Sequence, residues 1–92
     1  MSVTIAGINF DQHEYDKHGD VLHLSVGMPR EPARTWATPE GHAVDYDEAG
    51  AVIGLVLVNV RHLLGESDAV TVTIPLVREV EAAEIEPALK VS

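Results

Sequence analysis

Cysteine is absent from this 92-residue chain, and aromatic residues, basic residues and long apolar runs are scarce. Without cysteine there can be no disulfide and no cysteine-ligated zinc site, which fits the reducing cytosol. No apolar run approaches the roughly 18 residues that a membrane-spanning helix needs. The first ten residues carry no basic segment, so no signal peptide is predicted. We therefore expect a soluble cytoplasmic protein that does not bind a membrane.

Basic residues are outnumbered by acidic ones. Six Lys and Arg stand against fifteen Asp and Glu, which gives a formal net charge of -9. A field of this sign repels phosphate backbones, so binding to nucleic acid is not expected. The charge suits either plain solubility or association with a basic protein partner.

The scarcity of aromatic residues, 4% of the chain against 46% hydrophobic residues, decides how the core is built. Val, Ile, Leu and Ala must fill it, and abundant β-branched valine favours sheet. Ninety-two residues suffice for one domain near the lower end of self-sufficient core size. We predict a single α+β domain over residues 1–92, with a small, mostly antiparallel sheet of about five strands and one or two short helices.

The clearest pattern is an internal match between two segments of twelve residues. YDKHGDVLHLSV (15–26) aligns without a gap with YDEAGAVIGLVL (46–57). Each copy predicts a β-hairpin, with turns at residues 16–19 and 47–50. The first turn residue is aspartate, whose carboxylate can accept backbone N–H groups, and the last is glycine, which tolerates a positive φ. The chain is therefore expected to contain two similar hairpins.

The run over residues 51–60 is apolar at almost every position, so both of its faces should be buried. One or two short helices cannot cover both faces of so small a sheet. We therefore expect a homodimer in which a second copy covers the free face. Alternation places Val56 and Leu57 on opposite faces, and both are candidate interface residues. The pattern leaves open which face the second chain covers.

Residues 28–41 are predicted to form one long irregular segment, because they hold three of the five prolines. The segment also carries Arg30, Arg34 and the only tryptophan, Trp36. These three residues are candidates for a contact with a partner. The alternative is a crossover in which Trp36 folds back over a sheet edge or caps the core.

The C-terminal half predicts shorter elements. Asn59 can cap a helix over residues 60–64, with Gly65 just beyond its end. Alternation predicts a strand over 69–74. Residues 76–80 either extend the sheet or open a helix. Residues 82–92 are predicted to form a short helical turn and a tail, because Pro87 blocks a longer helix.

The two hairpin blocks, YDKHGDVLHLSVG and TPEGHAVDYDEAGAVIGLVLVN, resemble the YuzE-like family, domain of unknown function 2283, over about residues 10–64. The matching positions are Tyr15, Asp16, Asp20, Val21, Leu22 and Leu24, then Asp45, Tyr46, Asp47, Gly50, Val52, Gly54 and Leu55. The chain departs from the family at His23, where tyrosine is common, and at Gly19, where alanine is frequent. The resemblance implies a small α+β fold, often dimeric, and an antitoxin-like or regulatory role beside a basic partner. It supplies no active-site residue.

Five histidines raise the alternative of a metal- or small-ligand-binding domain. If the first turn ends at Gly19, His13 lies opposite His23, close enough to share a divalent ion with a third ligand such as His42. The simpler interpretation is two partly exposed histidines on the wet face of a hairpin. We therefore predict no metal site, with these three histidines as the candidates if one exists.

An enzyme of unknown reaction is the third function considered. No serine lies in a nucleophile elbow, and no glycine-rich loop follows a strand and opens a helix. No catalytic residue and no cofactor are predicted. The sequence favours a non-enzymatic, homodimeric protein-interaction domain that partners a basic protein.

Overall fold

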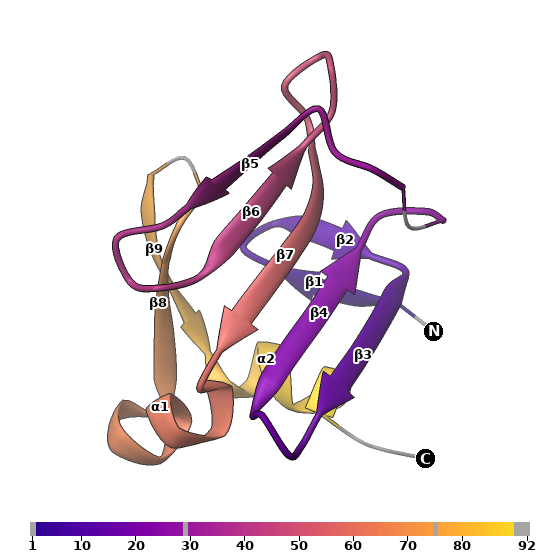
Figure 1. The fold of residues 1–92 in the computed structure, drawn as a ribbon. Coiled ribbons are helices and arrows are strands. Elements are labelled where there is room, and N and C mark those ends of the chain that lie inside the picture. Colours follow the sequence, from indigo (N-terminus) through magenta and orange to yellow (C-terminus); the bar gives the residue numbers. More distant parts are fainter. Residues whose placement is uncertain (1, 29, 75, 90–92) are drawn as a thin grey trace.

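The structure is a computed structural model that describes residues 2–28, 30–74 and 76–89. It belongs to the α+β class, as predicted, with nine strands and two helices over these residues (Figure 1). The elements in chain order are β1 (Val3–Ile5), β2 (Ile8–Phe10), β3 (Gln12–Asp16), β4 (Val21–Ser25), β5 (Arg34–Ala37), β6 (Ala43–Tyr46), β7 (Val52–Val58), α1 (Val60–Ser67), β8 (Ala69–Thr73), β9 (Val77–Glu81) and α2 (Ala82–Leu89).

A five-stranded antiparallel sheet with the order β3-β4-β7-β6-β5 forms the centre of the molecule. The two hairpins expected from the internal match are β3–β4 and β6–β7, and β4 pairs with β7 between them. Leu24 and Leu55 occupy the same position in the two copies, and they face each other in that pairing. The hairpins are therefore related by an approximate two-fold axis between these leucines.

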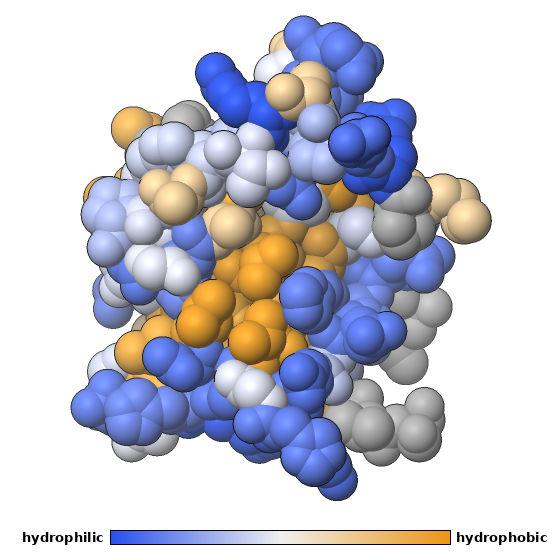
Figure 2. Space-filling view, viewed as in Figure 1, coloured by the Kyte–Doolittle hydropathy of each residue, from blue (hydrophilic) through white to orange (hydrophobic). Residues whose placement is uncertain are grey.

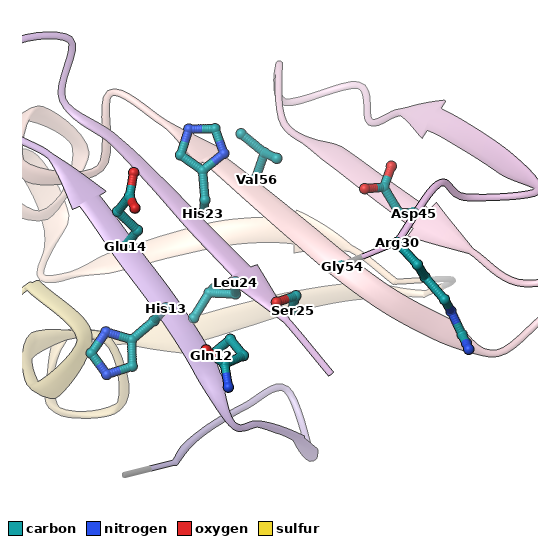
Figure 3. Close-up of a pocket in the computed structure, with 10 residues that line it drawn as sticks. All are labelled: Gln12, His13, Glu14, His23, Leu24, Ser25, Arg30, Asp45, Gly54 and Val56. Carbon is teal, nitrogen blue, oxygen red and sulfur yellow. The ribbon is translucent and has the colours of Figure 1, made fainter. Parts of the chain in front are cut away.

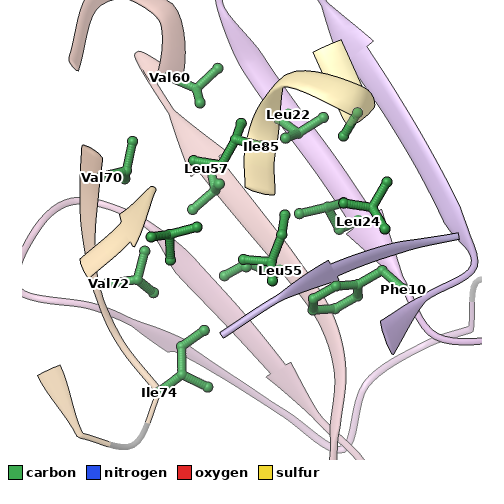
Figure 4. Packing of buried hydrophobic residues seen from close by; sticks show 14 of the residues in the cluster. Phe10, Leu22, Leu24, Leu55, Leu57, Val60, Val70, Val72, Ile74 and Ile85 are labelled. Atoms are coloured by element: carbon green, nitrogen blue, oxygen red, sulfur yellow. The ribbon is translucent and has the colours of Figure 1, made fainter. Parts of the chain in front are cut away.

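The core lies on one face of the central sheet. The small sheets β1–β2 and β8–β9 and helix α2 lie behind this sheet in Figure 1. Their side chains, such as Phe10, Val72 and Ile85, pack with Leu55 and Leu57 of β7 in one buried cluster (Figure 4). All five of these side chains are completely buried. The chain thus fills a core on one side of the sheet only.

The other face of the central sheet, here called the open face, carries the side chains that alternate with the core residues. No helix or strand of the described residues lies over it (Figure 1). Val21 and Val58 pair across β4 and β7, and Val56 lies two residues from Val58. All three valines are half-buried, and Figure 2 shows an apolar patch in the middle of this face.

Strand β5 lies within the segment 28–41, so the prediction of an irregular segment is wrong for its four residues. Arg34–Ala37 pairs with β6 over its whole length. Pro32 and Pro39 lie outside the strand and leave its hydrogen bonds intact. Trp36 is 40% exposed on this edge strand and pairs with the buried Val44 of β6, so alternation places its side chain on the core side of the sheet edge.

The two hairpin turns differ, although their sequences match. In the second turn Gly50 has a φ of 83°, as predicted, and its N–H donates to the carbonyl oxygen of Asp47. In the first, Asp16 pairs with Val21, and the left-handed residue is Asp20, with a φ of 57°. The prediction that Gly19 ends this turn in the left-handed region is wrong.

The helices continue beyond the residues expected to end them. Helix α1 passes through Gly65 and ends at Ser67, and its C-cap residue Asp68 has a φ of 58°. Helix α2 contains Pro87, and buried Ala88 and Leu89 follow it. Burial of these two side chains offsets the backbone hydrogen bond that proline removes. Neither helix in the described part of the chain is long and apolar enough to cross a membrane.

Candidate functional site

A shallow hollow of about 330 Å3 lies on the open face (Figure 3). Strands β3, β4, β6 and β7 supply nine of its lining residues, and the loop before β5 supplies one. The lining residues are Gln12, His13, Glu14, His23, Leu24, Ser25, Arg30, Asp45, Gly54 and Val56. Gly54 places no side chain on this face of the central strand, and the Asp45 side chain takes the space above it.

The Asp45 carboxylate is held in a fixed position above Gly54. The Thr35 hydroxyl donates to its Oδ1 atom at 2.7 Å. Its Oδ2 atom would lie 3.0 Å from a Cβ atom built on Gly54. Only glycine therefore fits under this carboxylate without displacing it.

The hollow contains charges of both signs. Glu14 and Asp45 supply carboxylates, and Arg30 is the only Lys or Arg among the lining residues. The Arg30 guanidinium lies 3.5 Å from Asp47 Oδ2 and is largely exposed. No serine hydroxyl in the described segments hydrogen-bonds to a histidine or a carboxylate. The arrangement offers polar contacts to a ligand, but no nucleophile paired with a base.

The three histidines considered as metal ligands do not converge. His23 pairs with Glu14, and His13 pairs with Leu24. The register between β3 and β4 therefore differs by one residue from the predicted one. Figure 3 shows His13 and Glu14 on opposite sides of β3. The prediction that His13 faces His23 is therefore wrong. Among the residues with described positions, no group of three or more His, Asp or Glu could hold a metal ion.

His42 does not line the hollow and lies between the β5–β6 turn and the end of β7. It is 2% exposed, and its Nδ1 atom accepts the Val58 N–H at 3.0 Å. Its Nε2 atom is buried without a partner among the described residues. Burial lowers the pKa of His42, and the nearby Glu40 carboxylate opposes this effect only in part. The neutral ring joins β6 to β7 and has a structural role.

Asp20 is the residue that sequence reasoning missed. Its carboxylate accepts the Arg61 N–H at 2.9 Å and the His62 N–H at 3.1 Å, and so caps α1. The Tyr15 hydroxyl also donates to it, at 2.7 Å. Asn59 occupies the N-cap position, as predicted, but its side chain makes no capping hydrogen bond. Sequence patterns for a helix start consider only neighbouring residues, so they cannot indicate a cap that a distant hairpin supplies.

The pKa of Asp20 reflects this cap. Burial raises it, but the Arg61 N–H, the Tyr15 hydroxyl, the His62 N–H and the Arg61 charge together outweigh burial. The pKa of Asp20 therefore lies below its ordinary value. Burial and the hydrogen bond to Asp20 raise the pKa of Tyr15.

The five predicted contact residues lie in different places. Val56 and Arg30 both line the hollow of the open face. Trp36 and Arg34 lie on the edge strand β5, where the Arg34 guanidinium stacks 5.1 Å from a tyrosine ring. Leu57 is completely buried in the core, so it cannot contact a partner. Of the two candidate dimer faces, the one with Val56 is free.

Comparisons with family models, with curated proteins and with solved structures found no match to this chain. The resemblance to the YuzE-like family therefore stays a prediction.

Proposed function

We propose that this chain is a non-enzymatic protein-interaction domain of the cytoplasm, which acts as a homodimer and binds a basic protein. The supporting observation is the open face of the central sheet. Val21, Val56 and Val58 leave an apolar patch there that no element of the described residues covers. Soluble monomers seldom expose a large contiguous apolar surface, and such a patch commonly marks a binding site.

A second copy suits this patch because two flat sheet faces can pack together about a two-fold axis. Complete burial of a valine side chain contributes roughly 1.5–3 kcal/mol. Three half-buried valines, present twice in a symmetric pair, therefore provide several kcal/mol towards association. Association also costs free energy, because two molecules lose translational and rotational freedom. Burial of the valine patch is the contribution that we expect to offset this cost.

The basic partner is supported by the charge of -9. An acidic domain attracts basic proteins over a distance and accelerates their encounter. A regulatory, antitoxin-like role beside such a protein is what the YuzE-like resemblance implies for the biological setting.

Three substitutions test the homodimer, with molar mass measured by light scattering at roughly tens of micromolar. Wild type should be a dimer, and Val56→Asp should give a folded monomer. Val77→Asp is the control, because Val77 is 70% exposed on β9, away from the open face, and this variant should remain dimeric. Leu57→Asp should unfold the chain, because it places a charge in the core. A monomeric wild type would overturn the homodimer.

A further inference from the structure

The open face has two different ends. Val21 and Val58 lie at the end next to α1, and Val56 lies near the middle. The opposite end is the hollow, where Gly54 of β7 lies between Asp45 of β6 and Ser25 of β4. An apolar surface and a polar, acidic depression therefore lie next to each other on one sheet.

Two carboxylates of the hollow are free to bind a cation. Asp45 uses Oδ1 for the Thr35 hydroxyl, and its Oδ2 accepts no hydrogen bond from the described residues. Glu14 is exposed, and its carboxylate likewise accepts none from them. The Arg30 guanidinium, which belongs to the lining, lies 3.5 Å from Asp47 Oδ2 and makes no hydrogen bond to Asp45 among the described residues.

The shape of the hollow selects a long side chain. The Asp45 side chain lies directly above Gly54. An aliphatic stem would lie beside it, over Ser25 and Val56, which also line the hollow. A guanidinium or ammonium group at the end of that stem would reach Asp45. Arginine matches a carboxylate with two parallel hydrogen bonds, and its charge complements the net charge of this chain.

We propose that the hollow over Gly54 receives an arginine or lysine side chain of the basic protein partner. This inference rests on the proposed function, and it adds where that partner binds. The partner segment lies across the strands at the hollow, while the valine end of the open face packs against the second copy. Asp45 is the contact for the cationic group, and Glu14, on β3 at the other side of the hollow, adds negative charge without touching the same group.

A capped tri-arginine peptide serves as the probe, with binding measured by backbone NMR shifts of the ¹⁵N-labelled chain. The peptide should shift the amides of residues 12–14, 45 and 54. Asp45→Asn should weaken binding about tenfold. Glu48→Gln is the matched control, because it removes the same charge from an exposed residue of the neighbouring turn, and its effect should be no more than about twofold. Equal weakening in both variants would overturn the site, because it would show attraction by net charge alone.

Gly54→Ala is the second variant. Its Cβ atom would displace the Asp45 carboxylate, so it should also weaken peptide binding. Unchanged binding in both Gly54→Ala and Asp45→Asn would overturn the inference.

The same titration on a Val58→Asp variant separates this inference from the homodimer, because Val58 belongs to the apolar patch but does not line the hollow. Peptide shifts at the hollow of a monomer would support the site even if the dimer proposal failed. Shifts confined to the acidic residues of β9 and α2 would overturn the site and leave a basic partner bound elsewhere.

Discussion

Asp20 connects the first hairpin to the helix that follows the second. Its carboxylate caps α1 and also accepts the Tyr15 hydroxyl. Asp20→Ala should reduce the free energy of unfolding by about 2–3 kcal/mol, because it removes a cap and puts alanine at a positive φ. Chemical denaturation followed by circular dichroism measures this loss.

Asp20→Gly separates the two contributions. Glycine removes the backbone strain but supplies no carboxylate, so this variant should still lose about 1–2 kcal/mol. A glycine variant as stable as wild type would show that the carboxylate does not cap the helix.

His42 makes stability depend on pH. Burial lowers its pKa in the folded state, whereas in the unfolded chain it titrates near its ordinary value of 6.5. As the pH falls, the unfolded chain therefore binds the proton first. The stabilisation by neutral His42 is complete above about pH 6.5 and is lost progressively as the pH falls below that value.

His42→Asn tests this dependence, because the asparagine oxygen can still accept the Val58 N–H but does not titrate. Urea denaturation at about pH 7.5 and pH 5.5 should show a smaller loss of stability in the variant than in wild type. An equal loss in both proteins would assign the pH dependence to other groups.

At the scale of elements, substitution by alanine is expected to change the stability of the fold in opposite directions at Gly50 and at Gly65. Gly50 closes the β6–β7 turn with a φ of 83°, and Gly65 lies inside α1. Added Cβ atoms would meet nothing within 4 Å at either position, so backbone conformation decides the outcome.

Gly50→Ala should therefore destabilise the protein by about 1 kcal/mol, and Gly65→Ala should stabilise it by about 0.5–1 kcal/mol. Melting temperatures of the two variants against wild type check both signs. A gain at Gly50 would contradict the left-handed turn.

The strands with clear alternation were predictable from the sequence. Residues 69–74 alternate Val and Thr, and β8 (Ala69–Thr73) buries Val70 and Val72 as that pattern requires. β5 was missed, because prolines flank its four residues and its pairing with β6 is not visible in local sequence. Both helices were predicted too short. Gly65 and Pro87 are residues that commonly end a helix, but this tendency does not include the stabilisation that a longer helix gains by packing against the rest of the protein.

The open face was predictable only in part. The apolar run of β7 indicated a free face, but only the structure shows that Val56 faces outward and Leu57 faces the core. The hollow depends on Asp45, Gly54 and Ser25 lying side by side on three strands. That register follows from a bulge between β6 and β7 near Asp45, which no spacing in the sequence indicates.

At the scale of the whole molecule, the repeat and the open face have a common origin. Two similar hairpins meet at β4 and β7, and together they form a sheet with two extended faces. The other described elements fill one face and leave the second uncovered. The core is thus formed on one face only, and the uncovered face is the surface where we propose that another polypeptide binds.

The net charge predicts how the two proposed associations respond to salt. Two copies that each carry -9 repel one another, whereas a basic partner is attracted. Raising the ionic strength from about 0.01 M to about 0.15 M shortens the Debye length from roughly 30 Å to roughly 8 Å. Self-association should therefore strengthen with salt, and binding of the tri-arginine peptide should weaken. Sedimentation velocity measures the first and NMR titration the second. A dimer that dissociates as salt rises would show that charge pairs, and not the valines of the open face, hold the two copies together.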